Sequence, residues 1–342
     1  MKSPFVIAAG WALALSAAGT SPSVLAATFE ATSTATAAGT LSSTQRDGTT
    51  QHTNGALSST SALLTESSAA GNLSHMQTSA WSQAGYGYVQ AFSQSSTLGW
   101  TNGSGLQAEA YASATASSQD AFTIQCAACT VGSYGWAVAR VLVSGSASLD
   151  GRINQQAFNS VNSGSTNQTL SLTVTADGVD NDPSNPTPPT SLQRVDSQNH
   201  FGASLIGYGW GAAPGYHDIV FKFVFGQAVH LDLQAATFSS ARVSLESDAP
   251  GLAGWETTQS DLTSGLTWAG LAAVTTVDGQ AINAFSALNS FGTNYARSFV
   301  AGAVPEPSSW ALMAAGLLAI LGFGRSRQAT RTRELADARL AG

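Results

Sequence analysis

Three groups of residues in this 342-residue chain have types and spacings that could bind a ligand or form a bond. The first is a run of hard oxygen atoms at Asp177, Asp180, Asn181 and Asp182, which suits calcium. The run lacks the full ligand set of an EF-hand and its terminal bidentate glutamate, so a solvated acidic turn is the simpler interpretation. We therefore expect no metal and no cofactor, and keep Asp177, Asp180 and Asp182 as a calcium candidate.

Aromatic residues between glycines form the second group, in Gly85-Tyr-Gly-Tyr88 and Gly207-Tyr-Gly-Trp-Gly211. Such rings can stack on the apolar C–H face of a sugar and add a hydrogen bond to it. The alternative is packing in a core or turn, since a chain with many alanines needs large residues elsewhere. The candidate glycan contacts are Tyr86, Tyr88, Tyr208 and Trp210.

The third group is the pair Cys126 and Cys129, the two cysteines of the chain. In an oxidising compartment a Cys-x-x-Cys pair can close into a small disulfide. The redox-active motif needs a βαβ setting, whereas residues 122–125 and 136–143 have the composition of strands. We expect a structural disulfide or an unpaired role in a loop, and no zinc ligand set accompanies the pair.

No catalytic constellation stands out in the sequence. Serine is abundant, but there is no Gly-x-Ser-x-Gly elbow and no phosphate-binding glycine loop. The paired carboxylates of a glycosidase are defined by their separation in space, which the sequence does not show. We expect that the protein is not an enzyme, with a secreted hydrolase as an alternative.

Charge argues against a nucleic-acid partner. The formal net charge is −7, and residues 28–303 hold 17 Asp and Glu against seven Lys and Arg, whereas nucleic acids require a basic surface. Most of the remaining polar groups are hydroxyls and amides. This composition is common in exported surface proteins.

Apolar and polar residues alternate with a period of two through most of the chain, as in half-buried strands. The clearest stretches are 108–117, 170–175, 219–225, 229–234, 243–246 and 268–277. Asp177-Gly178 and Asp278-Gly279 supply turn signals. Residues 58–70 also permit one helix. The pattern as a whole predicts an all-β fold, a β-sandwich of jelly-roll type.

Residues 28–303 are long enough for one large sandwich or two small domains. Residues 177–190 contain four prolines and interrupt the strand pattern, so they form a loop or a linker. Strands of the same character flank them, and neither half has an obvious closed set of strands. We therefore favour one sandwich with a long loop.

The N-terminus reads as a secretory leader over residues 1–27. Lys2 is followed by an apolar stretch from Phe5 to Ala18, and Val24-Leu25-Ala26 places small residues where signal peptidase cleaves. The apolar stretch is too short to cross a membrane comfortably. We expect cleavage after Ala26 or Ala27.

At the other end, Pro305-Glu306-Pro307 precedes an uncharged segment from Ser308 to Gly324, followed by Arg325 and Arg327. Prolines keep the motif extended, and the 17-residue segment is just long enough for a transmembrane helix. Cations at its end hold the C-terminus in the cytoplasm. Residues 328–342 then form a cytoplasmic tail, and the body of the chain lies outside.

This order of features resembles the PEP-CTERM sorting signal of Gram-negative bacteria, carried here by residues 304–327. The resemblance implies recognition and removal by exosortase, a membrane-embedded enzyme similar to cysteine transpeptidases. It also implies that the mature protein reaches the cell surface or the extracellular polysaccharide. Members of the family usually end within a few residues of the arginines, whereas this chain continues to Gly342.

Together these features predict an exported structural or adhesive protein of the cell surface or biofilm matrix. Its expected partners are signal peptidase, exosortase, the inner membrane during sorting, and exopolysaccharide. A carbohydrate-binding module is the alternative within the same fold class.

Overall fold

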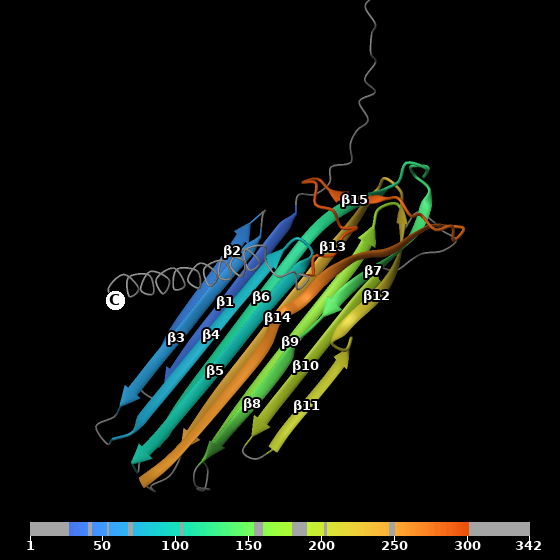
Figure 1. Cartoon of the computed structure of the whole chain (residues 1–342). Coiled ribbons are helices and arrows are strands. Elements are labelled where there is room, and N and C mark those ends of the chain that lie inside the picture. Colours follow the sequence, from blue (N-terminus) through green and yellow to red (C-terminus); the bar gives the residue numbers. More distant parts are fainter. Residues whose placement is uncertain are drawn as a thin grey trace, which may run out of the picture. The chain divides into compact units, whose positions relative to one another are not determined.

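The computed structural model of the chain describes residues 27–39, 43–52, 55–67, 71–102, 105–153, 160–179, 190–201, 204–245 and 250–300. Within these ranges the chain forms fifteen β-strands and no helix, so the expected all-β class is confirmed. The strands belong to one compact unit that ends at Phe299. They form two antiparallel sheets, and the chain crosses repeatedly from one to the other (Figure 1).

Sheet A has eight antiparallel strands, with the short strand β15 (Ser286–Asn289) paired to β6 beside the main row of seven. From one edge to the other, that row is β11 (Ser204–Gly211), β10 (Thr190–Phe201), β9 (Val161–Ala176), β13 (Ala228–Leu245), β6 (Leu106–Gln125), β1 (Thr28–Gly39) and β2 (Ser43–His52). Strands β9 and β10, which flank the proline-rich residues 180–189, pair directly with each other.

Sheet B has seven antiparallel strands, with β8 (Ser146–Ile153) paired to β14 beside the main row of six. That row is β12 (Gly215–Val224), β7 (Tyr134–Val143), β14 (Pro250–Thr276), β5 (Tyr88–Asn102), β4 (Leu73–Gly85) and β3 (Ala56–Ser67). The jelly-roll connectivity expected from the sequence stays a prediction.

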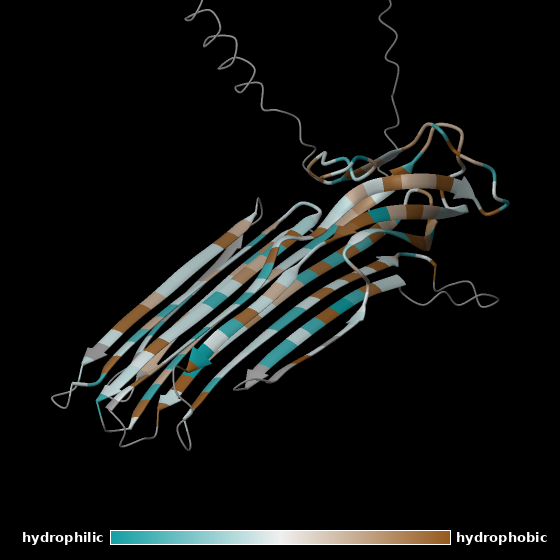
Figure 2. Ribbon diagram, turned by 60° about the horizontal axis from the view of Figure 1, so that its bottom comes forward, coloured by the Kyte–Doolittle hydropathy of each residue, from teal (hydrophilic) through white to brown (hydrophobic). Residues whose placement is uncertain are grey.

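Alternation in the sequence corresponds to alternation in burial. Strand β6 buries every second residue from Leu106 to Asp120, and β9 and β13 do the same over most of their lengths. Hydrophobic and hydrophilic bands therefore follow one another along the strands (Figure 2). The reason is that successive side chains of a strand point to opposite faces of its sheet, one toward the core and one toward solvent.

The helix considered over residues 58–70 is wrong where the structure describes them, because residues 56–67 form strand β3. This strand pairs with β4 without a break in register, from Ala56 opposite Ala84 to Ser67 opposite Leu73. Its Ala, Ser and Leu residues suit either conformation on local grounds. Cross-strand pairing and the burial of Ala56, Ser58 and Ala62 override any helical preference.

Serine hydroxyls connect the two sheets across the interior. Small residues on the inward faces bring the sheets close enough for a side chain of one sheet to reach a backbone carbonyl of the other. Such bonds join Ser82 to Thr32, Ser95 to Ser239, Ser118 to Gly85 and Ser260 to Asn167, at 2.9–3.1 Å. Each bond satisfies a polar group that would otherwise cost free energy when buried.

Large side chains fill one end of the sandwich. The rings of Phe122, Trp268 and Tyr295 lie within 4.9–6.1 Å of one another, and Phe299 stands 5.2 Å from Tyr295. The indole Nε1 of Trp268 donates to the Tyr295 carbonyl at 2.8 Å. These contacts hold the last described segment, residues 290–300, against the core.

Several predicted features lie outside the described residues. They are the leader over residues 1–26, the loop residues 180–189, the motif at Pro305, Glu306 and Pro307, the apolar segment 308–324, Arg325, Arg327 and the tail 328–342. Within the described ranges, no helix is long and apolar enough to cross a membrane.

Candidate functional site

The predicted aromatic contacts do not form one site, because they belong to different sheets. Tyr86 lies in the turn between β4 and β5, whereas Trp210 lies on β11, at the edge of sheet A. Trp210 is 55% exposed and is paired with Val195 of β10. Tyr208 is paired with Ser197, and its side chain lies outside the described part of the structure.

Tyr86 and Tyr88 differ in their surroundings although they are two positions apart. The ring of Tyr86 packs edge-on against Phe29 at 5.0 Å and lies 6.4 Å from Phe291. Burial raises the pKa of Tyr86, and the nearby carboxylate of Asp120 raises it further. Tyr86 is therefore part of the core packing. Tyr88 stays partly exposed and its hydroxyl accepts a hydrogen bond from Gln83 at 3.0 Å.

Cys126 and Cys129 are joined by a disulfide, with Cα atoms 5.3 Å apart. The bond closes the loop between β6 and β7, as a Cys-x-x-Cys pair outside a βαβ unit can do. A further backbone hydrogen bond from Cys129 N to the Cys126 carbonyl stabilises the same turn.

Of the calcium candidates, Asp177 lies within the described residues, while Asp180 and Asp182 lie outside them. The Oδ1 atom of Asp177 is 3.1 Å from Nε2 of His230, so this carboxylate already contacts another side chain. Across the described ranges, no group of three or more His, Cys, Asp or Glu residues is placed to hold a metal ion.

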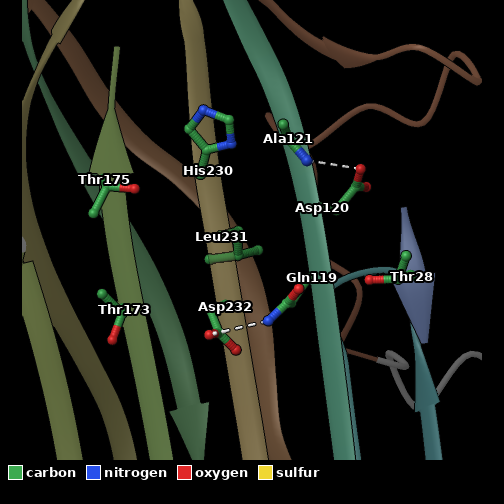
Figure 3. A pocket seen from close by; sticks show the side chains of 9 residues that line it. All are labelled: Thr28, Gln119, Asp120, Ala121, Thr173, Thr175, His230, Leu231 and Asp232. Carbon is green, nitrogen blue, oxygen red and sulfur yellow. Dashed lines mark hydrogen bonds between the residues drawn. The ribbon is translucent and has the colours of Figure 1, made fainter. Parts of the chain in front are cut away.

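The structure shows a recess that the sequence did not predict, on the outward face of sheet A. Four neighbouring strands, β1, β6, β13 and β9, contribute outward residues to two adjoining hollows of about 380 and 400 Å³. We call them together the sheet A trough. The first hollow is lined by Thr28, Gln119, Asp120, Ala121, Thr173, Thr175, His230, Leu231 and Asp232 (Figure 3).

Strand register explains how the trough forms. Thr28, Gln119, Asp232 and Thr173 stand opposite one another across the four strands. Two residues further along each strand, the next row of outward residues is Glu30, Ser117, Gln234 and Ser171, which line the second hollow. Rows of paired residues on one face thus bring together side chains that are up to about 200 positions apart in the sequence.

The polar groups of the trough are hydroxyls, amides and carboxylates. Gln119 donates to Asp232 at 3.5 Å, and Gln234 lies 3.4 Å from both oxygens of the same carboxylate. Glu30 adds a second negative charge. These groups can donate to and accept from a ligand rich in hydroxyls. The sequence showed the polar faces of residues 109–117, 170–175 and 229–234 separately, but their alignment across four strands depends on the fold.

Asp120 borders the first hollow, and its side chain is buried. Its Oδ2 atom accepts hydrogen bonds from the Tyr295 hydroxyl and, at 2.8 Å, from Nδ2 of Asn289, while Oδ1 accepts from the Ala121 amide at 2.8 Å. Burial raises the pKa of Tyr295 far above its ordinary value, and the charge of Asp120 and its hydrogen bond add to the effect. The cluster ties β15 and the following loop to β6.

Alkaline pH is therefore expected to destabilise the fold through Tyr295. Above about pH 10 the unfolded chain loses the proton of this phenol, whereas the folded chain keeps it. The stabilisation is present below that pH, and above it the free energy of unfolding should fall by about 1.4 kcal/mol per pH unit for this one group. Urea unfolding at pH 8, 10 and 11 measures the slope. Tyr295→Phe should be less stable throughout and should show a shallower slope; an equal slope would contradict the assignment.

Comparison with known proteins identifies a sorting motif near the C-terminus. Residues 303–328 match the family model of the PEP-CTERM protein-sorting motif, which confirms the resemblance seen in the sequence. No curated protein matches this chain. The fold and the motif together define an all-β protein with a C-terminal sorting signal, consistent with an exosortase substrate. The motif implies export and sorting to the cell surface through exosortase.

Proposed function

We propose that this protein acts outside the cell as a structural or adhesive component of the surface or matrix, without catalytic activity. The sorting motif over residues 303–328 carries this proposal, because it directs the chain toward export. In the proposed pathway signal peptidase removes residues 1–27, and the segment 308–324 holds the chain in the inner membrane. Arg325 and Arg327 set its orientation, and exosortase then cleaves at Pro305-Glu306-Pro307.

Within residues 28–303, the surface features favour a binding role over any other. The sheet A trough offers hydroxyls and amides along four strands, which suits contact with an exopolysaccharide. Trp210 adds an exposed ring at the edge of the same sheet, so a carbohydrate-binding module is the second candidate function. The jelly-roll connectivity is also part of the proposal, supported by the repeated crossing of the chain between the sheets.

Intact-mass analysis of the protein recovered outside the producing cell tests the sorting pathway. We expect the wild-type chain to have lost its leader and everything beyond about residue 305. A variant with Pro305, Glu306 and Pro307 all replaced by alanine should keep its C-terminus and stay with the membrane fraction. Wild-type protein that is found outside and extends to Gly342 would contradict the proposal.

A further inference from the structure

The outward face of sheet B carries aromatic rings and glutamine amides in successive rows, and we propose that this face binds an extended, uncharged polysaccharide. The face is formed by β4, β5 and β14, which lie side by side (Figure 1). It is opposite to the sheet A trough. The inference rests on the proposed function in one respect, namely that the domain is exported.

Cross-strand pairing creates two ring-bearing regions on this face. Trp81 of β4 stands opposite Phe92 of β5, and their rings stack at 6.2 Å with 16° between the planes. Further along the strands, Trp255 stands opposite Leu98, and Trp100 stands two residues beyond Leu98 on β5. Leu98 lies six positions beyond Phe92 on β5, which is roughly 20 Å along the strand.

These rings are on the surface and do not belong to the core between the sheets. Trp100 is 37% exposed and its neighbour Leu98 is 47% exposed, while Trp81, Phe92 and Trp255 are partly exposed. The inward positions between them are occupied by small side chains such as Ala80, Ser82 and Ser93. The fold thus places large rings outward where small residues already fill the interior.

Amides and hydroxyls occupy the rows between the two ring-bearing regions. Gln94 stands between Ser79 and Gln259, and Ser96 stands between Gln77 and Thr257. On the other side of the Trp81–Phe92 pair, Gln83 stands opposite Gln90 and donates to Tyr88. An amide offers both donors and acceptors, so these rows match the hydroxyl groups of a sugar polymer that stacks on the rings at either end.

Charge identifies the class of polymer. Along the outward positions of β4, β5 and β14 from residue 73 to 83, 88 to 102 and 253 to 261, the one acidic residue is Asp261, and Lys and Arg do not occur. On the adjacent strand β8, Arg152 stands opposite Trp255, and the acidic Asp150 lies two residues from it on the same face. A single cation with an acidic neighbour offers little to a polyanion such as an acidic polysaccharide or a nucleic acid. The rows of amides distinguish it from an apolar surface made for a second protein chain.

Retention on insoluble polysaccharides tests the proposal with the full chain in mild detergent. The probes are β-1,4-glucan, β-1,3-glucan and chitin as uncharged polymers, and alginate beads as an acidic one. At high salt, which screens charge contacts, we expect retention on at least one uncharged polymer and not on alginate. Trp81→Ala and Trp100→Ala should each weaken this retention roughly tenfold, since each removes one stacking platform.

Two further variants separate binding from folding and from the other sheet. Gln94→Leu keeps the volume of the side chain, so it should weaken retention while leaving the urea unfolding curve unchanged. Phe238→Ala removes a ring that is 37% exposed on the outward face of sheet A, and it should leave retention unchanged. The proposal is overturned if no uncharged polymer retains the protein, if alginate alone does, or if Phe238→Ala weakens retention as much as Trp81→Ala.

Analytical ultracentrifugation tests whether a second copy of the chain, and not a polysaccharide, binds this face. If a second copy of the chain covered it, the wild-type protein would sediment as a dimer that Trp100→Ala converts to a monomer, and the proposal would be wrong. The sorting pathway is tested separately by intact mass. If the protein is cleaved at its sorting motif but binds none of the polymers, the binding proposal for sheet B is wrong and the export proposal stands.

Discussion

Replacing Asp120 by alanine is expected to lower the free energy of unfolding by about 3 kcal/mol. The side chain is buried, and its two oxygens accept hydrogen bonds from Tyr295, Asn289 and the backbone amide of Ala121. Alanine leaves the phenol and the amide buried without their acceptor, and each such group costs about 1–3 kcal/mol. Urea unfolding of the full chain, followed by tryptophan fluorescence, measures the loss.

The chain offers a matched control on the opposite face of the same sheet. Asp232 of β13 is a partly exposed aspartate that accepts long hydrogen bonds from Gln119 and Gln234, at 3.4–3.5 Å. Asp232→Ala should change the free energy of unfolding by less than about 0.5 kcal/mol. Asp120→Asn keeps one acceptor oxygen and should fall between the two. Equal stability of Asp120→Ala and Asp232→Ala would show that the buried cluster contributes nothing.

Much of the fold could be predicted from the sequence because burial here follows a period of two. In β6, β9 and β13 the apolar residues of the alternation are the buried ones. In β3 the inward residues Ala56, Ser58, Thr60 and Ala62 are small, and two of them are polar, so the same signal is weak there. Local composition therefore permits a helix over 58–70, and pairing with β4 together with the burial of the inward residues decides against it.

The order of the strands and the surfaces they form could not be predicted in this way. Asp120 and Tyr295 are 175 positions apart, and nothing local in either segment indicates that they meet. The same holds for the pair Trp81 and Phe92, which depends on the register of β4 with β5. Glycine-flanked aromatics, by contrast, were visible in the sequence, but Tyr86 packs into the core while Trp210 is exposed.

A second buried carboxylate shows why particular glycines occur in strands that otherwise favour β-branched and hydroxyl residues. Glu256 of β14 is fully buried between the sheets, and Nδ2 of Asn162 donates to its Oε2 atom at 2.9 Å. Gly164 of β9 and Gly151 of β8 lie against the same carboxylate. A Cβ atom at either position would overlap with the oxygens of Glu256, so both glycines leave room for that side chain.

Gly164→Val is therefore expected to destabilise the protein by about 3 kcal/mol, although valine itself favours strands. The added methyl groups would displace the carboxylate from Asn162 or force the two sheets apart, and both cost free energy. Urea unfolding measures the loss. Ser165→Val is the matched control, because its side chain points outward on the same strand, and it should cost less than about 0.5 kcal/mol.

The double variant Gly164→Val with Glu256→Ala shows whether the two sites act through each other. Glu256→Ala leaves Asn162 without its partner but opens the space that valine needs, so the two losses should not add. We expect the double variant to be more stable than the sum of the single losses predicts, by at least about 1.5 kcal/mol. Strict additivity would show that Gly164 is needed for its backbone alone. A favourable coupling would show that this glycine is required by a carboxyl side chain buried on the opposite sheet.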